Sequence, residues 1–308
     1  MNNLARMRSS RIVAISAGLV AVFLFGASFV AIKVALVEVD PLTLIPVRFG
    51  LGLLLLWPLL MAREHKLRVT TGELARTAVL GGLSILFNQW FQAAAMISAT
   101  ATTASWLSAL APAFMALLAW IFLRERINSW QWLGIGLALG GALLVSDADP
   151  GSTFDADGWI VPAMLLLSAL AWAVFSVFGK AESVRTSPLR ATVLAMSWAF
   201  LFSLVLNMLS GSAWAPAAWQ MDTWIALAFL GIACTGLAYA LYFFALAGTQ
   251  SALVAALQYL EPLITISLAF VLLQESLRPI GFAGGALIII GIVLVERMGP
   301  VAIGKRPN

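Results

Sequence analysis

Hydrophobic residues fill ten long stretches of the chain, separated by short polar segments. A helix that crosses the hydrocarbon core of a membrane needs about 20 mainly apolar residues. The pattern therefore predicts an all-α integral membrane protein with ten transmembrane helices. The expected spans are 12–33, 42–62, 74–96, 102–123, 130–146, 158–178, 189–210, 224–247, 251–273 and 279–296. The fifth and tenth are short and rich in glycine, so we expect them at the edge of the bundle, in close contact with other helices.

The second half of the chain repeats features of the first at a nearly constant offset. The pairs that lie 150 residues apart are Pro112 and Pro262, Glu125 and Glu275, Gly134 and Gly284, and Gly141 and Gly291. Nearer the start of each copy the offset is 147, which relates Lys33 to Lys180 and Pro41 to Pro188. Five spans per copy is an odd number, so the second copy enters the membrane upside down. Inverted repeats of this kind form a substrate path near the bilayer midplane.

The repeat and the charges together predict the domains and the orientation. We expect a first repeat at 1–146, a linker at 147–157, and a second repeat with a short tail at 158–308. Most basic residues fall on one side of the membrane under the ten-span assignment: Arg6, Arg8, Arg11, Arg63, Lys66, Arg68, Arg76, Arg124, Arg126, Lys180, Arg185, Arg190, Arg297, Lys305 and Arg306. Basic loops stay in the cytoplasm. Both termini are therefore expected in the cytoplasm and the acidic linker in the periplasm.

Composition excludes several classes of protein. The chain is 62% hydrophobic and 10% charged, whereas soluble domains average about 25% charged residues. The net charge of +4 does not indicate a nucleic-acid partner, because the basic residues lie in short loops between apolar runs. One cysteine, Cys234, gives no disulfide framework. The expected surroundings are a lipid bilayer, and the oligomeric state is left open.

Several motifs resemble those of the EamA family, within the drug/metabolite transporter superfamily. The matching residues are Phe25, Gly26, Lys33, Pro41 and Arg48 early in the first copy, Trp172 in the second, and the sets Pro112, Leu123, Glu125 and Pro262, Leu273, Glu275. The resemblance covers nearly the whole chain. It implies a drug/metabolite transporter fold of five plus five helices in a bacterial inner membrane, usually exporting small metabolites such as amino acids. A facilitative carrier of drugs or other amphipathic metabolites is the alternative.

Polar and aromatic residues inside the third and eighth spans are candidates for a substrate path. Gln89 and Gln92 lie one helical turn apart and share a face. Their repeat partners, 150 residues later, are Tyr239 and Tyr242. These groups can bind a small solute by hydrogen bonds and ring contacts, or they can join helices and fill the core. Asn88 is expected to point elsewhere on the same helix.

The fourth and ninth spans supply a second group of candidates. Ser108 and Gln258 are repeat partners, each four residues before a proline, and a proline frees the backbone carbonyl one turn earlier. Tyr259 follows directly. We also expect Trp106 and Trp172 to form walls of the cavity.

Glu261 is the acid placed nearest the middle of a span, and Arg48 is the deeply placed base. An ionisable residue inside a membrane span is a functional candidate whose partner must be identified. Glu261 either carries a proton in exchange for substrate or forms a structural ion pair with Arg48. Its repeat partner is Ala111, so the site is asymmetric.

Other functional classes find little support. The one histidine, His65, lies in a loop, and no aspartate falls inside a predicted span. Catalysis needs a base or metal ligands placed together, so we expect no catalytic residues, no metal and no cofactor. A channel usually shows rings of like charge or a carbonyl filter, and neither is visible. An intramembrane enzyme and a channel are therefore the weaker alternatives to a secondary transporter of a small molecule.

Overall fold

The computed structural model describes residues 2–64, 68–123, 128–147, 159–211, 216–248, 257–276 and 279–297. Within these ranges the chain is helical and has no strand. Several sequence predictions fall outside the described residues: most of the linker at 147–157, Glu125, the start of the ninth span at 251–256, and the tail after residue 297.

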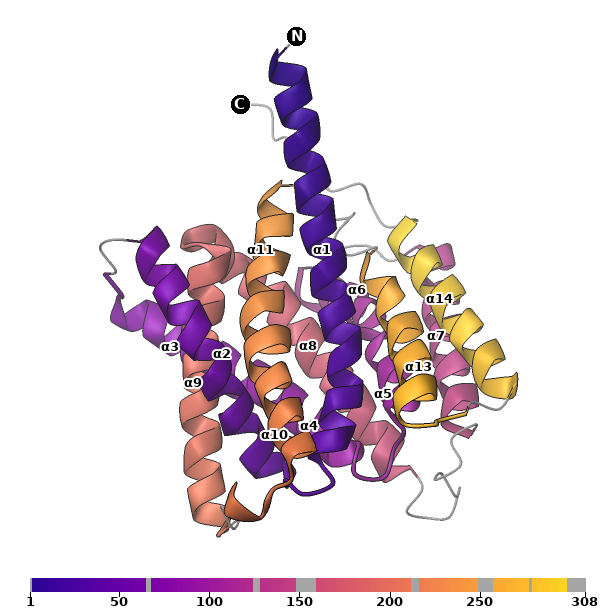
Figure 1. Cartoon of the computed structure of the whole chain (residues 1–308). Coiled ribbons are helices and arrows are strands. Elements are labelled where there is room, and N and C mark those ends of the chain that lie inside the picture. Colours follow the sequence, from indigo (N-terminus) through magenta and orange to yellow (C-terminus); the bar gives the residue numbers. More distant parts are fainter. Residues whose placement is uncertain are drawn as a thin grey trace.

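The helices lie side by side in a bundle (Figure 1). The first half contains α1 (Asn2–Ala35), α2 (Pro41–Arg63), α3 (Thr71–Val79), η1 (Leu80–Leu86), α4 (Phe87–Ala95), α5 (Ala101–Ser108), α6 (Ala111–Leu123) and α7 (Ser129–Asp147). The second half contains α8 (Ile160–Arg185), α9 (Pro188–Ser210), η2 (Pro216–Ala218), α10 (Met221–Ala228), η3 (Phe229–Leu237), α11 (Ala238–Gly248), η4 (Gln258–Leu260), α13 (Glu261–Leu272) and α14 (Pro279–Arg297).

Six helical segments are long and apolar enough to cross a membrane. They are Ile12–Ala35, Pro41–Arg63, Ala101–Phe122, Ile160–Gly179, Pro188–Ser210 and Met221–Tyr242. Three shorter apolar helices are Ser129–Val145, Gln258–Leu272 and Pro279–Val295. The predicted third span is helical from Thr71 to Ala95 but is not among these segments, because Asn88, Gln89 and Gln92 lower its hydropathy. The six long segments are thus the part of the ten-span prediction that length and composition support.

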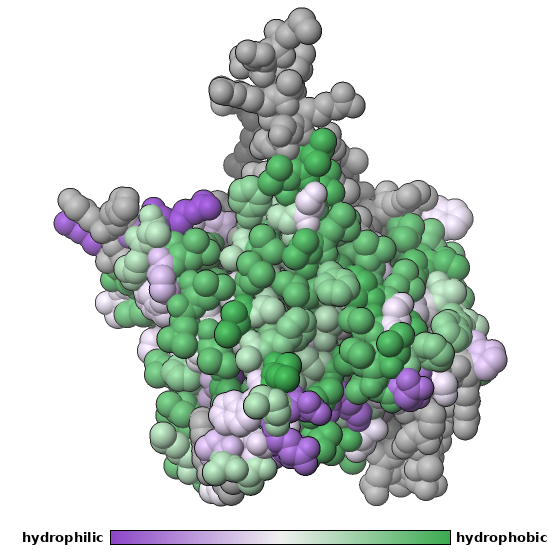
Figure 2. Space-filling view, in the orientation of Figure 1, coloured by the Kyte–Doolittle hydropathy of each residue, from purple (hydrophilic) through white to green (hydrophobic). Residues whose placement is uncertain are grey.

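Large apolar side chains are exposed on the outside of the bundle. Figure 2 shows hydrophobic side chains over the middle of one face, with hydrophilic residues gathered at its lower edge and beside α3. Large apolar side chains such as Leu54, Phe122 and Phe270 are more than half exposed. A soluble monomer rarely leaves such large contiguous apolar patches open to water. The surface therefore fits a lipid environment.

The glycine-rich helices α7 and α14 pack against each other in antiparallel directions at one edge of the bundle (Figure 1). A Cβ on Gly134 would lie 2.5 Å from the carbonyl oxygen of Gly291, and one on Gly141 would lie 2.5 Å from that of Gly284. The glycines therefore permit the close backbone approach that the sequence predicted for them.

Two of the predicted spans change helix type before they reach the centre of the bundle. η1 precedes α4, and η3 precedes α11; both are π-helical. A wider π turn inside an α-helix often occurs at a functional site. The fourth span is interrupted too, because α5 ends at Ser108 and α6 begins at Ala111, just before Pro112. Proline suits the start of a helix, where its missing N–H leaves no bond unmade. Residues of η4, α4, α5 and α11 line one cavity.

Candidate functional site

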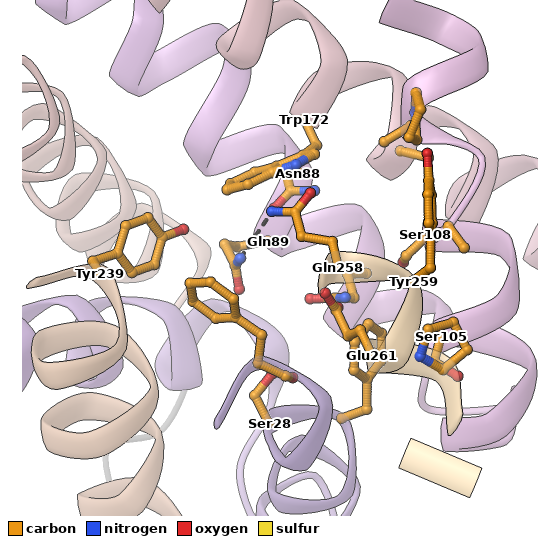
Figure 3. A pocket seen from close by; sticks show the side chains of 18 of the residues that line it. Ser28, Asn88, Gln89, Ser105, Ser108, Trp172, Tyr239, Gln258, Tyr259 and Glu261 are labelled. Carbon is orange, nitrogen blue, oxygen red and sulfur yellow. Dashed lines mark hydrogen bonds between the residues drawn. The ribbon is translucent and has the colours of Figure 1, made fainter. Parts of the chain in front are cut away.

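A cavity of about 100 Å³ lies among helices from both halves of the chain. This volume is several times the roughly 10–15 Å³ that one water molecule needs. Most of the candidates from the sequence line it: Arg48, Gln89, Gln92, Ser108, Trp172, Tyr239, Gln258, Tyr259 and Glu261. Figure 3 shows Tyr239 on one side and Ser108 and Tyr259 on the other, with Gln89, Gln258 and Glu261 between them. The tertiary structure thus gathers side chains that the sequence placed on different spans.

A chain of buried hydrogen bonds starts at Arg48. Its Nε donates to Thr235 Oγ1 at 2.9 Å, and its Nη1 donates to Gln89 Oε1 at 2.7 Å. Thr235 lies in the π-helical η3 and donates in turn to the carbonyl oxygen of Leu230 at 2.8 Å. Arg48 is 4% exposed. A buried guanidinium is stabilised only when neighbouring groups accept its protons, so these bonds fix one wall of the cavity.

Asn88 extends this network on the other side of Gln89. Its Oδ1 accepts from Gln89 Nε2 at 3.0 Å, and its Nδ2 donates to the Ser168 carbonyl oxygen at 3.0 Å. Asn88 also lines the cavity. Helical spacing from Gln89 and Gln92 suggested that it points elsewhere, and the structure corrects that expectation. The cavity covers a face of α4 wide enough to include adjacent residues. A polar residue inside an apolar span was the available signal.

Glu261 and Arg48 do not form an ion pair, which was one of the two alternatives that the sequence left open. Both line the cavity, yet no salt bridge joins these two described side chains, and Arg48 donates to Gln89 and Thr235 instead. Glu261 is the first residue of α13. The cavity is therefore lined by a carboxyl group and a guanidinium that are not bonded to each other.

Aromatic rings form much of the remaining lining. Phe25 and Tyr239 meet edge to face with ring centroids 5.3 Å apart, and Trp172 lies 6.4 Å from Tyr239. Phe25 was not among the predicted residues; only its place in the repeat motif marked it. Tyr242 is not among the residues that line the cavity; its ring contacts that of Phe25, with ring centroids 6.0 Å apart.

Trp106 also lies outside the lining. It is 2% exposed, and its indole packs so closely on Gly285 of α14 that a Cβ there would overlap it. Its neighbours Ser105 and Ser108 do line the cavity. Ser105 Oγ donates to the Thr102 carbonyl oxygen at 2.8 Å, whereas Ser108 Oγ has no hydrogen-bond partner among the described residues. Ser108 is therefore able to bond to a solute.

The described residues contain no group of three His, Cys, Asp or Glu side chains that could hold a metal ion. The lining offers amides, hydroxyls, aromatic rings, one described acid and one described base. Such a set can bind a small amphipathic solute by hydrogen bonds and ring contacts.

The chain is similar to several known proteins. A "Probable amino-acid metabolite efflux pump" of Salmonella typhimurium is 30% identical over 289 residues, which cover 90% of this chain and 92% of that protein. A "Probable terminal-alkyne amino-acid exporter" of Streptantibioticus cattleyicolor is 33% identical over 209 residues, covering 67% and 66%. A solved structure titled "Crystal structure of protein" shares the fold with a TM-score of 0.65 at 20% identity, covering 93% of this chain and 97% of its own.

The sequence model of the EamA-like transporter family matches residues 12–147 and again residues 159–297. These two matches take in nearly all of the described helices and every residue that lines the cavity. With its apolar helices, the chain is a multi-pass membrane protein. It belongs to the EamA-like transporter family.

Proposed function

We propose that the protein is a secondary transporter that exports small metabolites such as amino acids by alternating access. The observation that carries the proposal is the cavity itself, which is lined by polar and aromatic side chains of both halves in a bundle with an apolar surface. Polar groups inside a membrane span are costly unless they face a cavity or one another. The volume of about 100 Å³ favours a small metabolite over a large drug.

We further propose that ten spans form two inverted repeats, at 1–146 and 158–308, joined by a periplasmic linker at 147–157. The contact between α7 and α14 supports this arrangement. Gly134 meets Gly291 and Gly141 meets Gly284, and exchanging each glycine for its partner 150 residues away turns one contact into the other. A two-fold axis between the repeats would produce that reciprocity. The distribution of basic residues supports cytoplasmic termini in a bacterial inner membrane.

Transport in proteoliposomes tests the proposal. Purified protein is reconstituted, and uptake of labelled amino acids in exchange for trapped amino acids is measured. Gln92→Ala removes a cavity amide, and we expect transport to fall about threefold to tenfold, the effect of one lost hydrogen bond. Gln131→Ala is the control, because Gln131 is a buried glutamine of α7 outside the lining. Equal transport by wild type and Gln92→Ala, or no transport by wild type of any amino acid, would refute the proposal.

Proton coupling is tested in the same vesicles. Glu261 lines the cavity, and we propose it as the residue that carries the proton. If coupling holds, an imposed pH gradient accelerates flux in wild type but not in Glu261→Gln. Flux that ignores the gradient in both proteins identifies a facilitative carrier.

A further inference from the structure

The two ionisable residues of the described cavity lining differ in the hydrogen bonds that their side chains form with the protein. Arg48 donates to Thr235 and Gln89 and is 4% exposed. An anion that enters the cavity would have to compete with these bonds, at a guanidinium that is already largely covered. The carboxyl group of Glu261, in contrast, forms no ion pair or side-chain hydrogen bond with a described residue, and Glu261 lines the cavity and is partly exposed. Glu261 is therefore the ionisable group of the described lining that has no side-chain partner in the protein.

Glu261 is fixed in place by close packing between α13 and α1. A Cβ on Gly26 would lie 2.9 Å from the Glu261 carbonyl oxygen, so glycine alone fits there. One turn along α13, Thr265 Oγ1 donates to the carbonyl oxygen of Gly26 at 2.9 Å. Phe25, the residue before Gly26, lines the same cavity. The contact thus holds an aromatic ring and the carboxylate next to each other at one position in the bundle.

Further aromatic rings complete the surroundings of the carboxylate. Tyr239 meets Phe25 with ring centroids 5.3 Å apart, Trp172 lies 6.4 Å from Tyr239, and Tyr259 comes from the same turn as Glu261. All of them line the cavity. Aromatic faces attract cations, and they bind ammonium groups in many proteins. A carboxylate among such rings selects an organic cation.

The acidic residue has no acidic counterpart in the first repeat. The position of Glu261 in the first half is Ala111, which also lines the cavity. The described lining therefore offers one site for one ammonium group.

From these observations we infer that the site recognises its solute through a cationic amino group bound by Glu261 among the aromatic rings, and that a carboxylate on the solute is dispensable. This rests on the proposed transport function and narrows it to small primary amines, including amino acids, their esters and their decarboxylated forms. Glu261 is the residue that determines this specificity.

Binding to the purified full-length protein in detergent tests the inference. The probes are leucine and phenylalanine, their methyl esters, which keep the ammonium group but lose the carboxylate, and their N-acetyl derivatives, which keep the carboxylate but lose the ammonium group. Binding is followed by quenching of tryptophan fluorescence and by the shift of the thermal unfolding midpoint. We expect the esters to bind at least as tightly as the amino acids. We expect the N-acetyl derivatives to bind with an affinity lower by about tenfold or more.

Substitutions assign the preference to one carboxylate. Glu261→Gln keeps the shape and removes the charge, and we expect it to weaken ester binding about tenfold and abolish the preference over N-acetyl derivatives. Glu275→Gln is the matched control, because that glutamate lies outside the lining, and its preference should equal that of wild type.

Three results would overturn the inference: N-acetyl derivatives that bind as tightly as esters, a preference that persists in Glu261→Gln, or a wild-type protein that binds none of the ammonium probes at millimolar concentration. A failure of the transport proposal can be distinguished from a failure of this inference by measuring both binding and flux. Binding with the expected preference but no flux in proteoliposomes removes the transport function and leaves the recognition standing. Flux of N-acetyl derivatives equal to that of esters removes the recognition and leaves the transport.

Discussion

Charged side chains hold the two ends of the bundle together in different ways. We call one end the Lys33 end, where α1 and α4 end and α2 and α5 begin. We call the other the Arg190 end, where α2 and α8 end and α3 and α9 begin. At the Lys33 end the described charges bind the backbone of helix termini. At the Arg190 end they bind each other.

The turn between α4 and α5 shows the first arrangement. Lys33 Nζ donates to the carbonyl oxygens of Met96 and Ala99, each at 2.7 Å. The Glu275 carboxylate accepts from the backbone N–H groups of Ala101 at 2.9 Å and Thr102 at 3.1 Å. A helix leaves unpaired carbonyls at its end and unpaired N–H groups at its start. The cation and the anion each meet the terminus whose dipole attracts it.

The Arg190 end shows the second arrangement. Arg190 forms ion pairs with Glu73 at 2.6 Å and Glu64 at 3.1 Å, which join α9 to α3 and to the end of α2. Arg76 pairs with Glu182 at 2.5 Å and joins α3 to α8. The side chains of Glu73 and Arg190 are 4% and 14% exposed.

The two ends differ in the group that is left without a partner when one charged side chain is removed. A helix cap leaves behind neutral backbone groups, which cost about 1 kcal/mol. A covered ion pair leaves behind a charge of the opposite sign, which costs about 3–5 kcal/mol when it is buried. The Arg190 end should therefore be the more sensitive to substitution, to salt and to acid.

Arg190→Met should have the largest effect. It leaves Glu73 and Glu64 without their common partner, and we expect the free energy of unfolding to fall by about 3–5 kcal/mol. Thermal unfolding in detergent measures it. Arg185→Met is the control, because the Arg185 side chain is 61% exposed and lies 4.0 Å from Glu182, so its loss should cost less than about 1 kcal/mol. Equal effects of the two substitutions would contradict the comparison.

Glu275→Ala should have an intermediate effect. It removes the acceptor for two N–H groups at the start of α5, and we expect a loss of about 1–2 kcal/mol, the usual value of a helix cap. Glu275→Gln should lose less stability than Glu275→Ala, since its amide oxygen still accepts a hydrogen bond. The difference between wild type and Glu275→Ala should change little between 50 mM and 500 mM salt, whereas that for Arg190→Met should shrink. The same salt dependence at both ends would remove the distinction.

Acid should produce the smallest effect, through Glu182. The hydrogen bond and charge of Arg76 lower the pKa of this glutamate below its ordinary value of 4.5. A lowered pKa stabilises the folded protein at pH values above the unfolded pKa, and the contribution disappears as the pH falls through the folded pKa. Glu182→Gln should therefore be less stable than wild type at pH 7, by less than about 1 kcal/mol because Arg76 is 43% exposed. The two unfolding midpoints should converge as the pH falls below 4.5; a constant gap would contradict the assignment.

The helices could be predicted closely from the sequence. The second and seventh spans were expected at 42–62 and 189–210 and occur at Pro41–Arg63 and Pro188–Ser210. A helix in a membrane satisfies its own backbone groups, so its extent depends on local composition. The same reasoning located most of the cavity, because a polar residue in an apolar helix must face a cavity or another helix. Gln89, Gln258 and Glu261 were found in this way.

Contacts between distant segments determined the features that the sequence did not predict, among them the two π-helical segments. η1 packs on α9 so tightly that a Cβ on Gly81 would overlap the Ala195 carbonyl oxygen, and η3 packs likewise on Gly52 and Leu51 of α2. Nothing in hydrophobic periodicity indicates a π turn at these places.

The sequence by itself determined which apolar helices carry polar side chains, and such side chains must face a cavity or another helix whatever the fold. Only the tertiary structure decided their partners. An ion pair with Arg48 was one of two alternatives for Glu261, yet folding brought Gln89 and Thr235 to the guanidinium and left Glu261 facing the cavity. Hydrogen-bond partners depend on distances of a few ångströms, and those distances are set by how helices far apart in the sequence pack.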